Sequence, residues 1–183
     1  DLVKSGDVVT IAGFVGTGVP EELLIALENR FLKTKIPTDL TLLFAAAPGD
    51  GKARGLNHLA HKNLLRRSIG GHYGLAPKLG ALALSGDIEA YNFPQGVISH
   101  MYRDIASGKL GVLTKVGMET FVDPRLEGGK INAKTKEELV HRVEVLGTDY
   151  LFYMAPKIDV AIIRGTTADP DGNISMEREA LRL

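Results

Sequence analysis

The sequence predicts a layered α/β domain that combines a mostly parallel β-sheet, glycine-rich loops between strands and helices, and a small antiparallel β extension. Short apolar runs alternate along the chain with segments whose apolar residues recur at helical spacing. Glycine accounts for 21 of the 183 residues, which indicates many sharp turns between those segments. Hydrophobic residues make up 44% of the chain, which is enough for one well-buried core, so we expect residues 1–183 to form a single domain.

The first unit is expected to be a strand, a glycine loop and a helix. An apolar run at residues 8–11 precedes the loop at residues 13–18, and Pro20 opens a helical pattern. Proline is favoured there because the N–H that it lacks would have no partner in the first helical turn. The helix should pack one apolar face against a sheet, formed by Leu23, Leu24, Leu27 and Phe31.

The second parallel strand is expected at residues 39–46, because this short run is almost continuously apolar. Strands of parallel sheets are covered on both faces, and their sequences therefore lack the polar alternation of a half-exposed strand. The segment that follows, residues 48–55, contains Pro-Gly and Asp-Gly steps that are typical of an exposed loop. This loop should lie at the carboxyl end of the strand.

The alternation of strand and helix continues through the middle of the chain. We expect strand, helix, strand, helix and strand in that order, at residues 63–74, 76–87, 88–94, 95–107 and 110–117. Pro94 should end the strand at residues 88–94, and Gly108 is placed to cap the second of these helices.

The pattern changes near residue 140. Two extended runs at residues 140–146 and 149–155 flank Gly147 and Thr148, which predicts an antiparallel hairpin. A last apolar stretch at residues 157–165 precedes a turn signal, Asp-Pro-Asp-Gly-Asn, and the pattern from residue 175 onward is that of a helix start.

Composition excludes several classes of function. The 22 basic and 22 acidic side chains cancel, so neither nucleic acid nor an anionic membrane is expected as a partner. The absence of cysteine excludes thiolate chemistry within this chain. No apolar run approaches the ~20 residues that cross a bilayer, and the first residues lack the pattern of a signal peptide, so we expect a cytoplasmic protein. His58 and His61 are three residues apart, but the sequence implies no nearby carboxylate or third ligand, so no zinc site is expected.

The loop Gly-Phe-Val-Gly-Thr-Gly-Val-Pro lies between an expected strand and helix. Backbone N–H groups and the positive end of the helix dipole favour an anion at such a place. Glycines at positions 13, 16 and 18 would let the main chain approach a ligand closely. The spacing differs from that of the dinucleotide fingerprint, and the loop alone is equally compatible with a plain structural turn.

Other polar residues at these loops have two interpretations each. Lys52 and Arg54 could bind phosphate groups or could belong to a solvated loop. His72 stands beside a glycine turn and could act as a donor or base, or could be an ordinary surface histidine. Gln95 follows a strand at a helix N-terminus, where its amide could orient a carboxylate or cap its own helix.

Taken in order along the chain, these segments resemble the family I CoA-transferases, most closely the fused short-chain acyl-CoA:acetate CoA-transferases. The resemblance covers essentially the whole chain. The segments that carry it are IAGFVGTGVPEEL, APGDGKARGLNHLAHKNLLRRSIGGHYG, FPQGVISHMYRDIASGKLGVLTKVGMETFVDPRLEGGKIN and IIRGTTADPDGNISMEREA. Several ordered matches are far more specific than any single glycine motif.

The resemblance implies a ping-pong reaction in which a glutamate carboxylate attacks an acyl-CoA, and coenzyme A is carried as a glutamyl thioester to a second acid such as acetate. It implies that residues 1–183 are the alpha-type domain, and that the glutamate belongs to a beta-type catalytic half, fused or separate. This chain alone should then be inactive. Coenzyme A thioester would be a substrate, with no permanently bound cofactor and no metal, and the assembly would be a homo-oligomer working in short-chain fatty acid or ketone body metabolism.

The resemblance also implies site residues. Gln95 matches the family glutamine that helps position the acyl or carboxylate group, so we expect a supporting role in catalysis. The residues expected to bind substrate or coenzyme A are Gly16, Thr17, Gly18, Gly71, His72, Gln95 and Gly96.

One departure concerns acyl selectivity. Two-subunit relatives usually carry an Asn-rich step after the second strand, where this chain has the segment from Ala45 to Pro48. A less polar acid pocket would favour acetate, propionate or butyrate over dicarboxylates. The alternative to an enzyme is a non-catalytic ligand-sensing domain with the architecture of the sugar-phosphate isomerases. A regulator of that kind should carry a basic helix-turn-helix before the sensor, and this neutral chain begins almost directly at its first strand.

Overall fold

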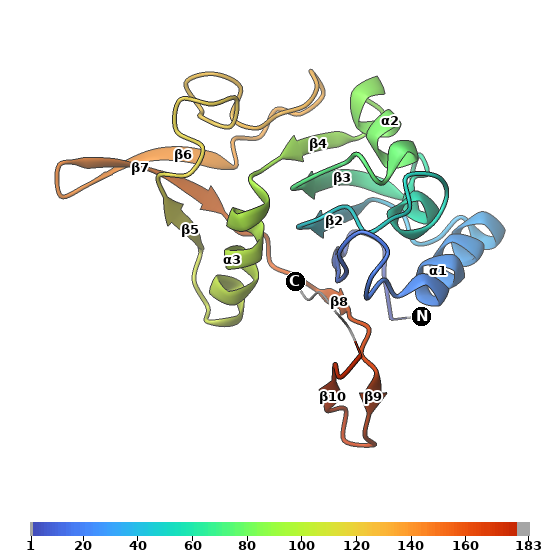
Figure 1. Cartoon of the computed structure of the whole chain (residues 1–183). Coiled ribbons are helices and arrows are strands. Elements are labelled where there is room, and N and C mark those ends of the chain that lie inside the picture. Colours follow the sequence, from blue (N-terminus) through green and yellow to red (C-terminus); the bar gives the residue numbers. More distant parts are fainter. Residues whose placement is uncertain (1, 179–183) are drawn as a thin grey trace.

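The computed structural model describes residues 2–178 and has a five-stranded parallel sheet at its centre (Figure 1). The strand order is β4-β3-β2-β1-β8, and each neighbouring pair is parallel. The strands are β1 (Val8–Ile11), β2 (Leu40–Phe44), β3 (Leu65–Gly70), β4 (Glu89–Asn92) and β8 (Val160–Ile162). The expected α/β class with a mostly parallel sheet is therefore confirmed.

Two separate cores cover the two faces of this sheet. One face packs against α1 (Glu21–Thr34), the short 3₁₀ helix η1 (Gly55–Leu59) and α2 (Pro77–Ser85). The other face packs against α3 (Gln95–Ala106) and a second, antiparallel sheet (Figure 1). Successive residues of a strand point to opposite faces, so Leu42 and Phe44 of β2 belong to the first core and Leu43 belongs to the second. All five residues of β2 are buried, as its continuous apolar run predicts.

The expected face of the first helix is confirmed with one correction. Leu24, Leu27 and Phe31 are buried in the first core, but Leu23 is 55% exposed. The three buried residues recur at helical spacing, and Leu23 lies at the border of their stripe, where the helix turns away from the sheet. The sequence pattern therefore predicted the helix and its packing face correctly, except that Leu23 does not belong to that face.

The strand expected at residues 110–117 forms, but it does not join the parallel sheet. It is β5 (Gly111–Thr114), which pairs with β7 (Thr148–Met154) in an antiparallel sheet of order β5-β7-β6. The outer edge of β4 contacts residues 129–131 instead, where Asn92 donates its backbone N–H to the carbonyl oxygen of Gly129 at 2.8 Å.

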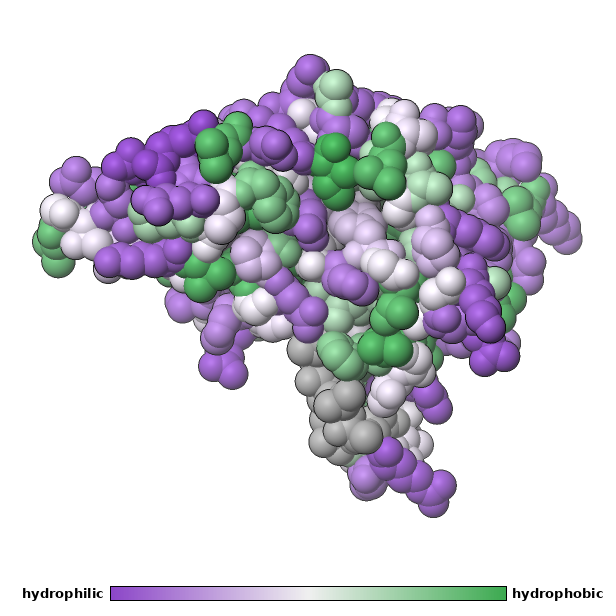
Figure 2. Space-filling model, turned by 45° about the horizontal axis from the view of Figure 1, so that its top comes forward, coloured by the Kyte–Doolittle hydropathy of each residue, from purple (hydrophilic) through white to green (hydrophobic). Residues whose placement is uncertain are grey.

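The expected hairpin near residue 147 is confirmed as β6 (Val140–Val145) and β7, which extend away from the body of the molecule (Figure 1). Its turn consists of Leu146 and Gly147, both with positive φ, whereas Thr148 already belongs to β7. The surface of this hairpin is mainly hydrophilic (Figure 2). Leu146 at the turn is an exception, with 99% of its surface exposed.

The last apolar stretch contains β8, which the sequence did not identify as a strand. This strand pairs with β1 on one side, and its other side has no strand partner within residues 2–178. A small hairpin, β9 (Thr167–Ala168) and β10 (Ile174–Ser175), then encloses the predicted turn. The helix expected from residue 175 does not begin by Arg178, and residues 179–183 lie outside the described part of the chain. Within that part, no helix is both long and apolar enough to cross a bilayer.

Candidate active site at the carboxyl edge of the sheet

The loops after the first strands meet at one edge of the parallel sheet and are tied to one another by backbone hydrogen bonds. Gly49 donates its N–H to Val15 at 2.7 Å, which joins the loop after β2 to the loop after β1. Gly71 donates to Phe44 at 3.1 Å, and Phe93 donates to Gly70 at 3.0 Å. The carboxyl ends of parallel strands are where open α/β sheets bind ligands. The residues of interest therefore stand where such a site would form.

The glycine loop is a tight, ordered turn. Phe14 and Thr17 exchange two backbone hydrogen bonds of 2.9 Å, and Gly18 has a φ of +68°, which favours glycine. Gly16 is different, because a Cβ placed on it would meet no atom within 4 Å. The tip of the loop at Gly16 and Thr17 thus faces open space, and packing within this chain does not explain the glycine at position 16.

Gln95 is held against the loop after β3. A Cβ placed on Gly71 would lie 2.1 Å from the carbonyl oxygen of Ala45 and 2.9 Å from Cα of Gln95, so only glycine allows this close approach. The Gln95 side chain is half-buried, and its amide makes no hydrogen bond to any residue between 2 and 178. It does not cap α3, whose N-cap is Pro94 without a side-chain hydrogen bond. A Cβ placed on Gly96, the next residue, would meet no atom within 4 Å.

A cavity of about 550 Å³ connects this edge with α3. Gly13, Ala45 and Ser99 contribute to its lining, so it touches the loops after β1 and β2 and the first turns of α3. Tyr102 closes one side, where its hydroxyl lies 3.0 Å from the Thr10 hydroxyl. Burial raises the pKa of Tyr102.

His72 is exposed and does not share that cavity. Its ring packs beside Gly74 and faces a different hollow of about 380 Å³, which Asn92, Phe121 and Lys130 also line. Gly71 approaches Gln95 closely and also lines this second hollow together with His72. Gln95 lines neither of these two cavities.

The loop at residues 48–55 is more rigid than its sequence suggests. Oδ1 of Asp50 accepts the backbone N–H groups of Lys52, Ala53 and Arg54 at 2.9, 2.8 and 3.0 Å. The N–H of Arg54 contributes most to lowering the pKa of this carboxyl. The side chains of Lys52 and Arg54 are exposed and form no ion pair with another described residue. Both interpretations of these cations therefore stay open.

A cluster that the sequence did not reveal lies beside this loop. The ring of His58 contacts Glu28 through Nδ1 at 2.5 Å and Glu21 through Nε2 at 3.0 Å. Nε2 of His61 contacts the other oxygen of Glu28 at 2.7 Å. The expectation that no carboxylate lies near these histidines was wrong. The signal in the sequence was weak, because it consists only of two glutamates seven residues apart on one helical face.

The charges of the cluster change its titration. Burial alone would lower the pKa of His58, but the hydrogen bonds to Glu28 and Glu21 outweigh it and raise the pKa. Burial alone would raise the pKa of Glu28, but the hydrogen bonds to His61 and His58 lower it. Within residues 2–178, no three histidine, aspartate or glutamate side chains are arranged to hold a metal ion.

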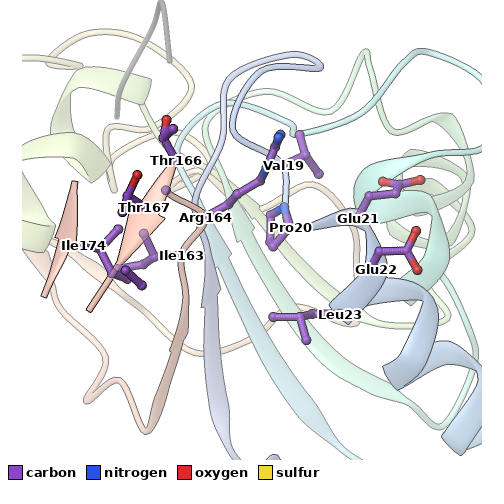
Figure 3. A pocket seen from close by; sticks show the side chains of 12 residues that line it. Val19, Pro20, Glu21, Glu22, Leu23, Ile163, Arg164, Thr166, Thr167 and Ile174 are labelled. Carbon is purple, nitrogen blue, oxygen red and sulfur yellow. The ribbon is translucent and has the colours of Figure 1, made fainter. Parts of the chain in front are cut away.

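Another hollow, of about 660 Å³, lies elsewhere, between the start of α1 and the chain after β8 (Figure 3). The Arg164 side chain lies beside Val19 and Pro20, while the carboxylates of Glu21 and Glu22 point away from it (Figure 3). None of the residues expected to bind substrate contributes to this hollow. Volume alone therefore does not identify the candidate site.

Comparison with known proteins gives one consistent result. The family model described as "Coenzyme A transferase" matches residues 1–182. The chain is 43% identical over 178 residues to the caffeate CoA-transferase of Acetobacterium woodii, covering 97% of this chain and 34% of that protein. It is 38% identical over 170 residues to the acetate CoA-transferase YdiF of Escherichia coli strain K12, covering 92% of this chain and 32% of that protein.

A solved structure agrees with these relatives. The crystal structure of the acyl-CoA transferase YdiF from Escherichia coli O157:H7, in a thioester complex with CoA, superposes with a TM-score of 0.94 at 35% identity. The superposition covers 97% of this chain and 35% of that chain. The chain thus spans about a third of the length of the relatives that it matches.

Proposed function

The chain belongs to the coenzyme A transferase family, as the N-terminal part of family I enzymes, and we propose that the full-length protein moves coenzyme A between a short-chain acyl-CoA and a carboxylate such as acetate. The two relatives described above are about three times as long as this chain. We therefore propose that the catalytic half is fused to this domain, and that this domain by itself is inactive.

The proposed reaction proceeds in two half-reactions on a glutamate outside this chain. Its carboxylate attacks the thioester carbonyl of the acyl-CoA, which gives a mixed anhydride and releases the CoA thiolate. The thiolate then attacks the glutamyl carbonyl, so a glutamyl-CoA thioester forms and the first acid leaves as its carboxylate. The second acid reverses these steps and leaves with coenzyme A. Dividing one exchange into such steps is the advantage of covalent catalysis, and no electrons are gained or lost.

The observation that carries this proposal is the position of Gln95. Its side chain is half-buried, its amide has no partner among residues 2–178, and its backbone is fixed by the close approach of Gly71 and Ala45. An amide without a protein partner can donate a hydrogen bond to a substrate carboxylate or carbonyl oxygen without first losing a hydrogen bond to the protein. We propose that Gln95 positions the acyl group or the incoming acid.

The glycines have separate proposed roles. Gly16 and Gly96 leave open space in which substrate can approach the backbone, and we propose that Thr17 and Gly18 contact the substrate beside Gly16. Gly71 supports the site through its contact with Gln95. His72 faces another hollow, so its proposed contact would be with a part of coenzyme A that lies away from the reacting acyl group.

The test is intact-mass spectrometry of the full-length protein after incubation with acetyl-CoA, quenched under conditions that preserve thioesters. A mass increase equal to coenzyme A is the expected result, and digestion should locate it outside residues 1–183. Absence of any adduct with several short acyl-CoAs would reject the transferase and favour the ligand-sensing alternative. An adduct on a separate polypeptide would reject the proposed fusion only.

Selectivity for small monocarboxylic acids is a finer proposal. Ala45, Ala46 and Ala47 are all buried, and no polar side chain in this segment faces the edge of the sheet. A dicarboxylate would have to bury its second charge without a partner there, which is costly. Competition among acetate, propionate, butyrate and succinate for coenzyme A from one donor should therefore disfavour succinate. A clear preference for succinate would reject this proposal without affecting the reaction type.

A further inference from the structure

The histidine and glutamate cluster joins three elements of the fold. Glu21 and Glu28 belong to α1, His58 belongs to η1, and His61 follows η1. Exposure of the four side chains lies between 18% and 29%, so water has limited access to them. No other titratable group among residues 2–178 makes a hydrogen bond or ion pair with the His58 ring.

The geometry requires a particular protonation state of His58. Its two ring nitrogens each face a carboxylate, and an ionised carboxylate only accepts hydrogen bonds. Neutral imidazole has one N–H donor, whereas imidazolium has two. Only the protonated ring can therefore satisfy both Glu21 and Glu28, and loss of the proton would set a nitrogen lone pair against a carboxylate.

This contact reaches the candidate active site through the start of α1. Glu21 is the first residue of α1, three positions after Gly18, and its second oxygen accepts the backbone N–H of Gly55 at 2.9 Å. The segment that contains Gly55 also contacts the glycine loop itself, because Gly49 donates its backbone N–H to the carbonyl oxygen of Val15. The segment from Gly49 to His58 thus contacts the glycine loop directly at Val15 and, through Glu21, the start of the helix that follows the loop.

Asn57 anchors this segment from the other side. It is 1% exposed, donates to the carbonyl of Arg54 at 2.8 Å, and accepts the backbone N–H of Lys78 in α2 at 3.0 Å. Because α2 and Asn57 hold η1 in place, the ring of His58 has a fixed point from which to hold α1. If the start of α1 at Glu21 moves, η1 should therefore stay in place and the glycine loop should move with α1.

We propose that His58 is a positioning residue of the transferase: as an imidazolium bound to Glu21 and Glu28, it fixes the start of α1 and thereby the glycine loop. The inference rests on the proposed function but names a residue that does not touch substrate. Since the contact requires the charged ring and two ionised carboxylates, it is complete only where both carboxylates are ionised and His58 is protonated, and it is lost as pH rises through the pKa of His58 in the folded protein. Turnover should decline over the same pH interval.

The experiment uses the full-length protein with H58Q and, as a matched control, H61Q. Glutamine at position 58 can satisfy one carboxylate but not both, whereas H61Q removes a contact to Glu28 and leaves that to Glu21 intact. We would measure kcat and KM for exchange between acetyl-CoA and propionate across the pH range in which imidazoles titrate. Independent readouts are the NMR titration of the His58 ring and hydrogen exchange of the amides at residues 13–18.

The expected result is a fall in kcat of roughly 10- to 100-fold in H58Q, since a displacement of about 1 Å can cost on the order of 10²-fold. In the wild type, the decline of kcat at high pH should have the same midpoint as the NMR titration of His58. This decline should be absent in H58Q. Hydrogen exchange in the glycine loop should become faster in H58Q only. H61Q should keep the wild-type profile.

Several outcomes would overturn the inference. An unchanged pH profile in H58Q, unchanged exchange in the glycine loop, or an equal effect of H61Q would each reduce His58 to an ordinary packing residue. If H58Q does not fold, E21Q replaces it, because it keeps an acceptor for Gly55 and should move the alkaline decline to lower pH. If the wild type transfers no coenzyme A, the proposed function fails, while the titration and exchange data still decide whether His58 holds the loop.

Discussion

Substitution of Gly71 by alanine should damage the candidate site more than its size suggests. The added Cβ would lie 2.1 Å from the carbonyl oxygen of Ala45, whereas ordinary contacts begin at 3.4 Å, so these atoms must separate by about 1.3 Å. It would also lie 2.9 Å from Cα of Gln95. Both neighbours are backbone atoms, so rotation of a side chain cannot relieve the conflict.

The expected cost follows from these distances. Overpacking of this kind destabilises by about 1–3 kcal/mol, and each kcal/mol lowers the melting temperature of a domain of this size by about 2–4 °C. Because the displacement falls on Gln95, G71A should also reduce the rate of CoA exchange by roughly 100-fold. Thermal unfolding and exchange between acetyl-CoA and propionate would measure the two effects in the full-length protein.

G96A is the matched control for stability. It adds the same methyl group to the residue after Gln95, where no atom lies within 4 Å, and alanine is favoured over glycine in a helix by about 0.5–1 kcal/mol. Its melting temperature should stay equal or rise. A G71A protein that is as stable and as active as the wild type would refute the reasoning, since the Gly71 contact would then have no structural consequence.

Three further substitutions have distinct expected outcomes. Q95A should lower kcat for CoA exchange by about tenfold or more with an unchanged melting temperature, because its amide has no partner among residues 2–178; a loss of stability would instead indicate a structural role. Y73F removes a hydroxyl that donates to the Tyr91 carbonyl at 2.9 Å and should cost about 0.5–1.5 kcal/mol in denaturant unfolding, with activity retained. D123N should loosen the loop at residues 117–131, because Asp123 is fully buried and binds Arg125 through two side-chain hydrogen bonds. The hydrogen bond with Arg125 lowers the pKa of this carboxyl, so its contribution to stability is fully present above the unfolded value of about 3.9 and is lost as pH falls from there through the lower pKa of the folded protein. Acid unfolding of D123N should accordingly lack this component.

Local patterns predicted the elements whose structure depends on nearby residues. The helical spacing of Leu24, Leu27 and Phe31 and the continuous apolar run of β2 each specify an element and the face that it buries. The same spacing misplaced Leu23, because a periodic pattern does not define where a buried stripe ends. Proline and glycine marked the boundaries of α3 and the hairpin turn for equally local reasons.

Non-local pairings could not be predicted in the same way. β8 has only three residues, and it becomes a strand because it pairs with β1, which lies about 150 residues earlier. The partner of β5 is β7, beyond a segment of irregular structure. His58 meets Glu28 across 30 residues and Glu21 across 37. Spacing within a helix or strand carries no information about such contacts. The contacts of His58 with α1 could therefore be found only from the structure.

One side of β8 has no strand partner within residues 2–178, which has a practical consequence for work with this domain. An unpaired strand edge is a template on which another polypeptide can form hydrogen bonds, and here Ile163 and Leu23, each about half exposed, flank it with apolar surface. Residues 1–183 prepared alone should therefore self-associate as the protein concentration rises. Crystallisation and spectroscopy of the isolated region would then report on aggregates, and the full-length chain is the better material for both.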